Sequence, residues 1–248
     1  MHRFYIPPAY IQGDTLTLPP DTARQAASVL RMRPGECILV FDNQGMEYQV
    51  ELTTVQTRTG TGMVRKRWQA QPGPQAHITL FQSPLKRENF EWVLQKCTEV
   101  GVMRFVPTLY ARTVVNRQEV SAARGERWQR ILVEACEQCH AAHLPVLENS
   151  LEFKHALRMV QPGEFSLIPW EAEQGLNLGK VLADYHPGSG QPRINLFIGP
   201  EGGLAEEEIH AARQAGLTPV TLGRRVLRSE TAAVVSAALI LAHYEEMV

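Results

Sequence analysis

The chain has 248 residues, of which 44% are hydrophobic and 21% are charged, and its formal net charge at pH 7 is -1. These values are typical of a soluble globular protein of one or two domains, and no apolar run is long enough to cross a membrane. The N-terminal segment MHRFYIPP lacks the apolar stretch of a secretion signal, so we expect a cytoplasmic protein without a membrane partner.

The four cysteines predict free thiols rather than disulfides or a metal site. They are few for a chain of this length, and Cys136 and Cys139 lie only three residues apart on a predicted helix. The segment CEQCHAAH (136–143) places possible metal ligands on one helical face, where four ligands rarely converge on a tetrahedral ion. We therefore expect packed thiols, surface histidines and no bound metal.

The first part of the chain predicts short strands and one helix. Residues 20–30 have a helical composition, and the strand-like residues 38–41 lead into a turn at 42–45. Residues 48–52 alternate in hydrophobicity at the period of a strand. This pattern is typical of a small β-barrel or sandwich.

The segment QPGPQ (71–75) marks the predicted domain boundary, because its prolines and glycine interrupt the patterns on either side. Beyond it, strand-like and helical segments alternate along the chain, at 77–81, 89–100, 102–106, 122–142, 165–168, 178–185 and 194–198. This alternation predicts a mostly parallel sheet covered by helices on both faces. We expect an α/β protein with one domain over residues 1–71 and another over 77–248.

The last predicted helix, roughly residues 230–246, is apolar almost all round. A helix with so little polar surface needs burial on more than one side. We therefore expect it to pack on the sheet and also on a second copy of the chain, which predicts a homodimer.

Two glycine-containing segments near the C-terminal end predict a ligand site. IGPEGGL (198–204) and LGRRVLRSE (222–230) each follow a predicted strand that stops at a glycine, and each precedes a helix. At the carboxyl end of a strand such loops line ligand sites with their backbone. Neither segment matches a P-loop or a dinucleotide-binding fingerprint. A tight turn without a ligand is the alternative for the first segment.

The polar side chains of these segments have two kinds of expected role. Ser229 is predicted as the N-cap and Glu230 as a first-turn acid of the last helix. The acids at 206–208 lie in the first turn of the helix predicted after the first segment, where they suit the helix dipole, and they are expected to be solvated. Arg228 lies in a loop with two further arginines and indicates an anionic or polar substrate.

Together the two segments resemble the signature loops of the RsmE family, ribosomal RNA uridine-N3 methyltransferases of the SPOUT class. The resemblance extends to VLRMRPG (29–35), EWVLQKCTEVGV (91–102) and EACEQC (134–139). It implies an N-terminal PUA-like RNA-binding β-barrel and a C-terminal SPOUT domain with a parallel sheet and a deep trefoil knot. A homodimer is also implied.

The resemblance further implies that S-adenosylmethionine is the cofactor and that N3 of a uridine in small-subunit (16S) ribosomal RNA is methylated, in free RNA or in the small ribosomal subunit. In this family the cofactor contacts the backbone of the signature loops. The corresponding positions are Ile198, Gly199, Gly202, Leu222, Gly223 and Leu227.

The chemistry of uracil N3 suggests roles for three side chains. N3 carries a weakly acidic proton and is a poor nucleophile until that proton leaves, so a base or a cation that stabilises the uracil oxygens is expected. Arg228 is the candidate cation, and Glu230 or Glu201 is the candidate base.

RNA binding is expected to involve a set of basic residues. For any one of them, the alternative is a solvated surface charge without an RNA contact. They are Arg3, Arg24, Arg31, Arg33, Arg65, Lys66, Arg67 and Arg112. The chain also departs from the family pattern. Ala111 replaces a common acid, the residues after Cys139 lack a common arginine, and Ala205 replaces a frequent capping serine, a change worth about 1 kcal/mol.

Two other functions stay open. A methyltransferase of the same class acting on a different RNA position is the alternative within catalysis. A non-catalytic RNA-binding ribosome assembly factor is the alternative outside it.

Overall fold

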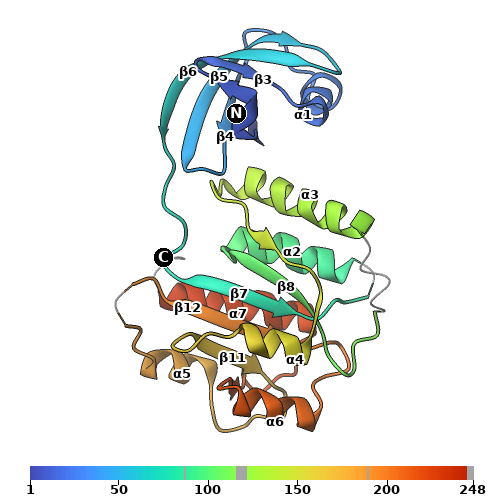
Figure 1. The fold of residues 1–248 in the computed structure, drawn as a ribbon, viewed down its shortest axis with the longest axis vertical. Helices are drawn as coiled ribbons and strands as arrows, with labels where there is room; N and C mark the ends of the chain where they lie inside the picture. The colour runs from blue at the N-terminus through green and yellow to red at the C-terminus, as the bar shows by residue number, and fades with distance from the viewer. Residues whose placement is uncertain (87, 116–121, 189, 245–248) are drawn as a thin grey trace. The chain divides into compact units, whose positions relative to one another are not determined.

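The computed structural model describes residues 1–86, 88–115, 122–188 and 190–244, and their contacts divide the chain into two units (Figure 1). The first unit comprises Met1–Gly73 and Cys136–Leu144, and the second comprises Pro74–Ala135 and Pro145–Val248. The change from one unit to the other at Gly73 falls within the interval between the two predicted domains. The grouping of residues 136–144 with the first unit differs from the continuous ranges expected.

The first unit is built on a six-stranded sheet with the order β1-β4-β5-β6-β3-β2. Its strands are β1 (Arg3–Tyr5), β2 (Ile11–Gln12), β3 (Thr15–Thr17), β4 (Cys37–Phe41), β5 (Met46–Val55) and β6 (Gly60–Gln69). Neighbouring strands are antiparallel except for β1 and β4. The predicted helix is confirmed as α1 (Pro20–Arg24), which continues into a π-helical turn, η2 (Gln25–Val29). A short 3-10 turn, η1 (Pro8–Tyr10), follows β1.

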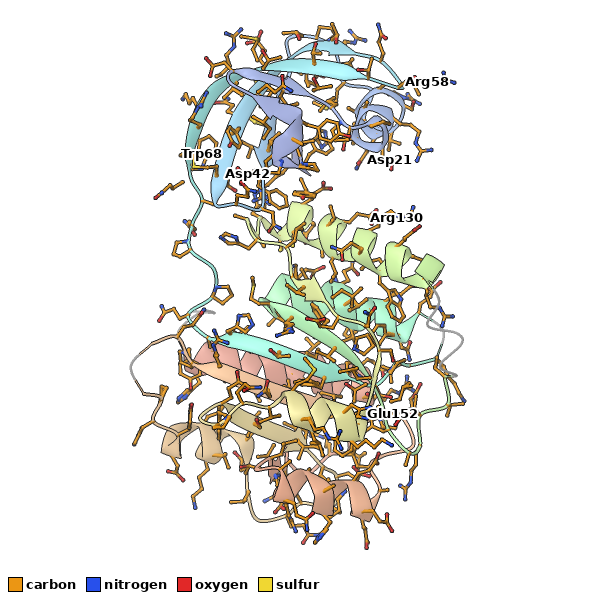
Figure 2. The ribbon with its side chains drawn as sticks, in the orientation of Figure 1. Asp21, Asp42, Arg58, Trp68, Arg130 and Glu152 are labelled. Carbon is orange, nitrogen blue, oxygen red and sulfur yellow. The ribbon has the colours of Figure 1, made fainter. Side chains whose placement is uncertain are left out.

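Asp42 organises the predicted turn between β4 and β5. Its buried carboxylate accepts hydrogen bonds from the backbone N–H of Gln44 at 2.7 Å and of Met46 at 3.1 Å, and from the Tyr48 hydroxyl at 3.0 Å. Figure 2 labels this residue at the end of the sheet. The turn is thus held by one acid that bonds the backbone ahead of it, which is the usual role of aspartate in turns.

Arg3 binds residues 136–144 to the first unit. Its guanidinium donates to the carbonyl oxygens of Cys136 and Ala141, both at 2.9 Å, and to the Glu47 carboxylate at 2.7 Å. It also lies 4.2 Å from the centre of the Phe41 ring, and the residue is only 7% exposed. The structure therefore corrects the expectation that Arg3 contacts RNA, because its charged group is buried and engaged within the fold.

The second unit is built on a parallel sheet with the order β10-β8-β7-β12-β11-β13, and β9 also pairs with β8. Its strands are β7 (His77–Gln82), β8 (Arg104–Leu109), β9 (Val146–Leu147), β10 (Leu151–Glu152), β11 (Phe165–Pro169), β12 (Arg193–Ile198) and β13 (Thr218–Val220). Its helical elements are α2 (Asn89–Val100), α3 (Ala122–Cys139), α4 (Phe153–Ala156), η4 (Leu157–Met159), α5 (Leu178–Asp184), α6 (Glu206–Gln214) and α7 (Ser229–His243), of which α3 ends within the first unit. The predicted alternation and the parallel sheet are confirmed.

Helices cover both faces of this sheet, because successive strand residues point to opposite sides. On β12, Leu196 packs in a core shared with α2, α3, α5 and α7, whereas Phe197 packs in a second core shared with α4 and α6. Phe197 stacks on Phe81 of β7 with ring centres 4.1 Å apart. Among the residues that the structure describes, none of the helices has the length and apolarity needed to cross a membrane.

All four cysteines are free thiols in the fold. Burial raises the pKa of the Cys136 thiol to about 12, and its S–H donates to the carbonyl oxygen of His143. Burial also raises the pKa of Cys97, whereas Cys37 and Cys139 are partly exposed.

This difference predicts the order in which the thiols react. Because the thiolate is the reactive form, alkylation of the native protein at pH 8 modifies Cys37 and Cys139 well before Cys97 and Cys136, as peptide mass spectrometry measures. In denaturant all four react at similar rates. Labelling of native Cys97 as fast as Cys37 would contradict the packing described.

Candidate functional site

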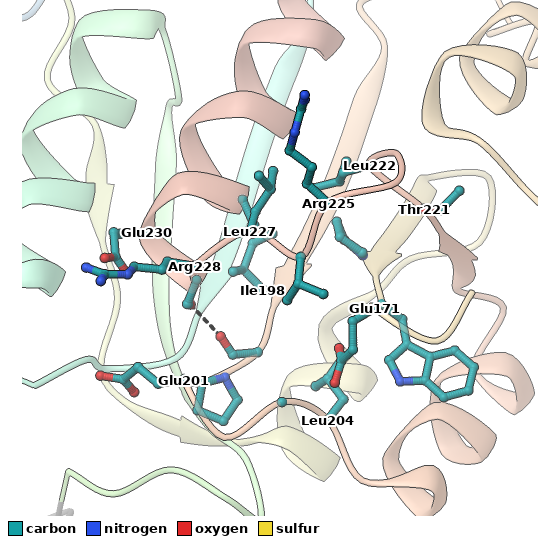
Figure 3. Close-up of a pocket in the computed structure, with 18 of the residues that line it drawn as sticks. Glu171, Ile198, Glu201, Leu204, Thr221, Leu222, Arg225, Leu227, Arg228 and Glu230 are labelled. Carbon is teal, nitrogen blue, oxygen red and sulfur yellow. Dashed lines mark hydrogen bonds between the residues drawn. The ribbon is translucent and has the colours of Figure 1, made fainter. Parts of the chain in front are cut away.

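A cavity of about 640 Å³ opens where three neighbouring strands of the parallel sheet end. It is bounded by the first loop (residues 199–205) after β12, the second loop (residues 221–228) after β13, and the end of β11 (Figure 3). Because β11 lies between β12 and β13, these parallel strands release their following segments at one edge of the sheet. The volume lies within the range of about 300–1,000 Å³ found for small-molecule sites.

The structure brings all nine predicted cofactor and catalytic residues to this cavity. The lining includes Ile198, Gly199, Gly202, Leu222, Gly223, Leu227, Arg228, Glu230 and Glu201. It also includes residues that the sequence does not single out, namely Asn89, Pro169, Trp170, Glu171 and Thr221. Pro169, Trp170 and Glu171 lie at or just after the end of β11. Their place in the site depends on the order of strands in the sheet, which periodicity does not reveal.

Ser229 joins the two loops. Its hydroxyl donates to the carbonyl oxygen of Gly199 at 2.5 Å and accepts from Nε2 of Gln82 at 3.0 Å, and Gln82 also donates to the Ser83 carbonyl. Helix α7 begins at Ser229 itself, and Arg228 occupies the N-cap position without a side-chain capping bond. The prediction of Ser229 as N-cap is therefore wrong, because its hydroxyl bonds the other loop instead.

The glycines of the first loop allow close packing on its inner and outer sides. A Cβ at Gly203, where φ is +74°, would lie 2.4 Å from Oε1 of Glu171. A Cβ at Gly202 would lie 3.2 Å from Cβ of Arg112, whose guanidinium donates to the Gly202 carbonyl at 3.1 Å. Arg112, predicted to contact RNA, thus supports the backbone of the cavity wall.

Glu208 fixes the start of α6 to a neighbouring loop. Its buried carboxylate accepts hydrogen bonds from the backbone N–H of Ala111 at 2.8 Å and of Ala205 at 2.9 Å. The expectation that this acid is solvated is wrong, because it lies against the segment that follows β8. Ala205 has no capping side chain, but Glu208 satisfies its N–H from the helix.

Three charged side chains gather toward one end of the cavity (Figure 3). Glu201 accepts a hydrogen bond from the backbone N–H of Lys86 at 3.0 Å, and Oε1 of Glu230 accepts from Nδ2 of Asn89 at 3.4 Å. Within the described ranges, Oε2 of Glu230 is buried without a hydrogen-bond partner. The exposed Arg228 guanidinium makes no hydrogen bond or ion pair with the described residues. Chemically, this end can accept a proton and stabilise a developing negative charge.

The basic residues predicted for RNA in the first unit, apart from Arg3, are exposed. Arg65 pairs with Glu51 at 2.9 Å, and Arg67 pairs with Asp14. Arg31 adopts a left-handed backbone conformation with φ of +54°. Exposed ion pairs of this kind are weak, so these arginines can exchange their partners for phosphates.

Comparison with known proteins gives consistent matches along the chain. Residues 71–241 match the family model of the RNA methyltransferase domain. The ribosomal RNA small subunit methyltransferase E of Synechocystis is 32% identical over 98% of this chain and 78% of its own length. That of Bacillus subtilis is 27% identical over 89% of this chain and 87% of its own length.

This chain belongs to the RsmE family. A solved RsmE structure from Neisseria gonorrhoeae, bound to S-adenosylmethionine, is 31% identical, with a TM-score of 0.86 over 98% of this chain and 97% of the other. A methyltransferase from Legionella pneumophila, also with S-adenosylmethionine, is 30% identical, with a TM-score of 0.88 and the same coverage. The match to RsmE proteins thus spans both units and both loops of the cavity.

The tie between the loops predicts unequal effects for two serines of α7. Ser229→Ala removes one of the two acceptors of the buried Gln82 amide and the donor to the Gly199 carbonyl, so the free energy of unfolding falls by about 1–3 kcal/mol in urea titrations. Ser236 is the matched control, because its hydroxyl is buried on the same helix without a hydrogen-bond partner among the described residues. Ser236→Ala leaves stability unchanged or slightly higher. Equal losses in both variants would contradict the proposed tie.

Proposed function

We propose that this protein transfers the methyl group of S-adenosylmethionine to N3 of a uridine in small-subunit ribosomal RNA. The proposal rests on the loop-lined cavity, at one end of which, among the described residues, the Arg228 guanidinium and Oε2 of Glu230 have no hydrogen-bond partner. The names of the relatives give the RNA class, and two relatives of 30–31% identity hold S-adenosylmethionine.

The residues of the cavity fit this cofactor. Its apolar wall suits an adenine ring and is formed by Ile198, Leu204, Leu222, Leu227 and Ala232. The glycines let backbone N–H and C=O groups approach the ligand, as in other nucleotide sites. When bound, S-adenosylmethionine supplies a methyl group on a positively charged sulfur.

Glu230 is the preferred base for the N3 proton. Each acid accepts one hydrogen bond, but Oε2 of Glu230 is buried without a partner among the described residues, whereas Glu201 is exposed to solvent. Transfer of the N3 proton to Glu230 leaves the electron pair on N3, which makes this nitrogen the nucleophile. Arg228 donates to a uracil oxygen and stabilises the negative charge that spreads over the ring.

RNA binding falls to the exposed basic residues of the first unit and to Arg112. The first unit supplies Arg24, Arg31, Arg33, Arg65, Lys66 and Arg67. Contacts to phosphates make affinity fall steeply with salt concentration. We interpret the six-stranded sheet as the PUA-like domain and the parallel unit as a SPOUT domain with a trefoil knot.

We also propose that two copies pair through α7, in the cytoplasm. Val235, Ala238, Leu239 and Ala242 follow one face of the helix and keep exposed surface, with Leu239 exposed by 48%. Apolar side chains at this spacing favour helix packing across a twofold axis. Sedimentation as a monomer at micromolar concentration would contradict the dimer.

The direct test is methyl transfer to unmodified small-subunit RNA, free and in subunits, with radiolabelled S-adenosylmethionine. N3-methyluridine cannot pair normally, so reverse transcription stops at the product and maps it. Methylation at another atom supports the alternative of a different RNA position. RNA binding without uptake of S-adenosylhomocysteine in calorimetry supports the assembly factor instead.

Arg228→Ala is expected to reduce kcat by roughly 10²–10³, the effect of removing one donor to a developing oxyanion. The Kd of S-adenosylhomocysteine changes by less than about threefold, because the predicted cofactor contacts are backbone groups. Arg130, an exposed arginine of α3, provides the control (Figure 2). Arg130→Ala retains full activity. Unchanged methyl transfer by Arg228→Ala would eliminate its proposed role.

A further inference from the structure

Asn89 lies at the same end of the cavity as Arg228 and Glu230, although it comes from a distant part of the chain. It is the first residue of α2, whereas the other two lie at the start of α7. All three line the cavity. Helices α2 and α7 pack in one core, which fixes the starts of the two helices relative to each other.

The hydrogen-bonding capacity left in these side chains forms a defined pattern. The Asn89 amide nitrogen gives one hydrogen to Oε1 of Glu230 at 3.4 Å, and its second hydrogen is unused by the described residues. A carboxylate only accepts, so this contact sets the amide nitrogen toward Glu230. Oε2 of Glu230 offers an acceptor, and the Arg228 guanidinium offers donors. This end of the cavity therefore offers a donor from Asn89, an acceptor from Glu230 and a donor from Arg228.

We propose that Asn89, Glu230 and Arg228 recognise the pairing edge of uracil and exclude cytosine. Uracil presents an acceptor, a donor and an acceptor in O4, N3–H and O2, which complements the three side chains. Cytosine presents an amino group in place of O4 and a bare N3 that accepts. Its amino group meets a donor and its N3 meets a carboxylate, so two polar contacts are lost in a partly buried site.

The arrangement would couple base recognition to the chemistry, and this inference rests on the proposed function. The Glu230 oxygen that recognises N3–H is the atom that takes its proton. Asn89 holds the other oxygen and so directs Oε2 to the substrate. A base without an N3 proton cannot donate a hydrogen bond to Glu230 and has no proton to transfer to it.

Substitutions at Asn89 test the pattern. Asn89→Ala removes one donor and is expected to lower kcat/KM for small-subunit RNA about tenfold. Asn89→Asp replaces the donor with a second carboxylate and is expected to lower kcat/KM at least about 100-fold. The Kd of S-adenosylhomocysteine stays within about twofold in both. Asn149→Asp, at an exposed asparagine, adds the same charge and leaves kcat/KM unchanged.

Base discrimination separates recognition from a merely structural role. With S-adenosylhomocysteine present, wild-type protein binds RNA with the mapped uridine at least about tenfold more tightly than RNA with cytidine there. Asn89→Ala is expected to reduce this preference for uridine over cytidine. Glu230→Gln, which replaces the acceptor with a group that can donate to cytosine N3, removes or reverses it.

Two outcomes overturn the inference while uridine N3 methylation stands. One is a kcat/KM for Asn89→Ala within twofold of wild type, and the other is an equal loss of affinity for both RNAs. Failure of the wild-type protein to methylate any uridine contradicts the proposed function, and the inference fails with it.

Discussion

The hydrogen bond from Ser229 to the carbonyl oxygen of Gly199 is the contact on which the cavity depends. It joins two loops that follow different strands, and Gln82 supports it from a third strand, β7. Among the described residues, it is the hydrogen bond that links the first loop to the start of α7. Since the ligand contacts proposed there are mostly backbone groups, their spacing depends on how firmly the two loops are held together.

The order of the parallel sheet creates the conditions for this contact. β12 and β13 both pair with β11, so their loops leave the sheet at one edge and enclose the end of β11 between them. Glu208 and Arg112 then fix the first loop from outside through Ala111, Ala205 and Gly202. The start of α7 lies beside these loops and brings Arg228 and Glu230 to the cavity. The fold thus forms the cavity mainly from loop backbone and brings the charged side chains of Arg228 and Glu230 to it from the start of α7.

The sequence predicts the parts of this protein that local pattern determines. Strand period and glycine position identify the parallel sheet and both loops, whereas the individual backbone positions that line the cavity come from the resemblance to the RsmE family. Roles that arise from long-range contacts are different. Ser229 reads as a cap and Glu208 as a solvated acid, because their partners lie 30 and 97 positions away. Arg3 is interpreted as a surface charge because the two carbonyl oxygens that bind its guanidinium follow more than 130 residues later.

Hydrogen–deuterium exchange with and without S-adenosylhomocysteine tests whether both loops form one ligand site, since it measures both loops at once. We expect slower exchange at amides of residues 199–204 and 222–228 together when the ligand binds. Amides of β4, β5 and β6 keep their exchange rates. Protection of only one loop, or of neither despite binding, would contradict a single site formed by the backbone of both.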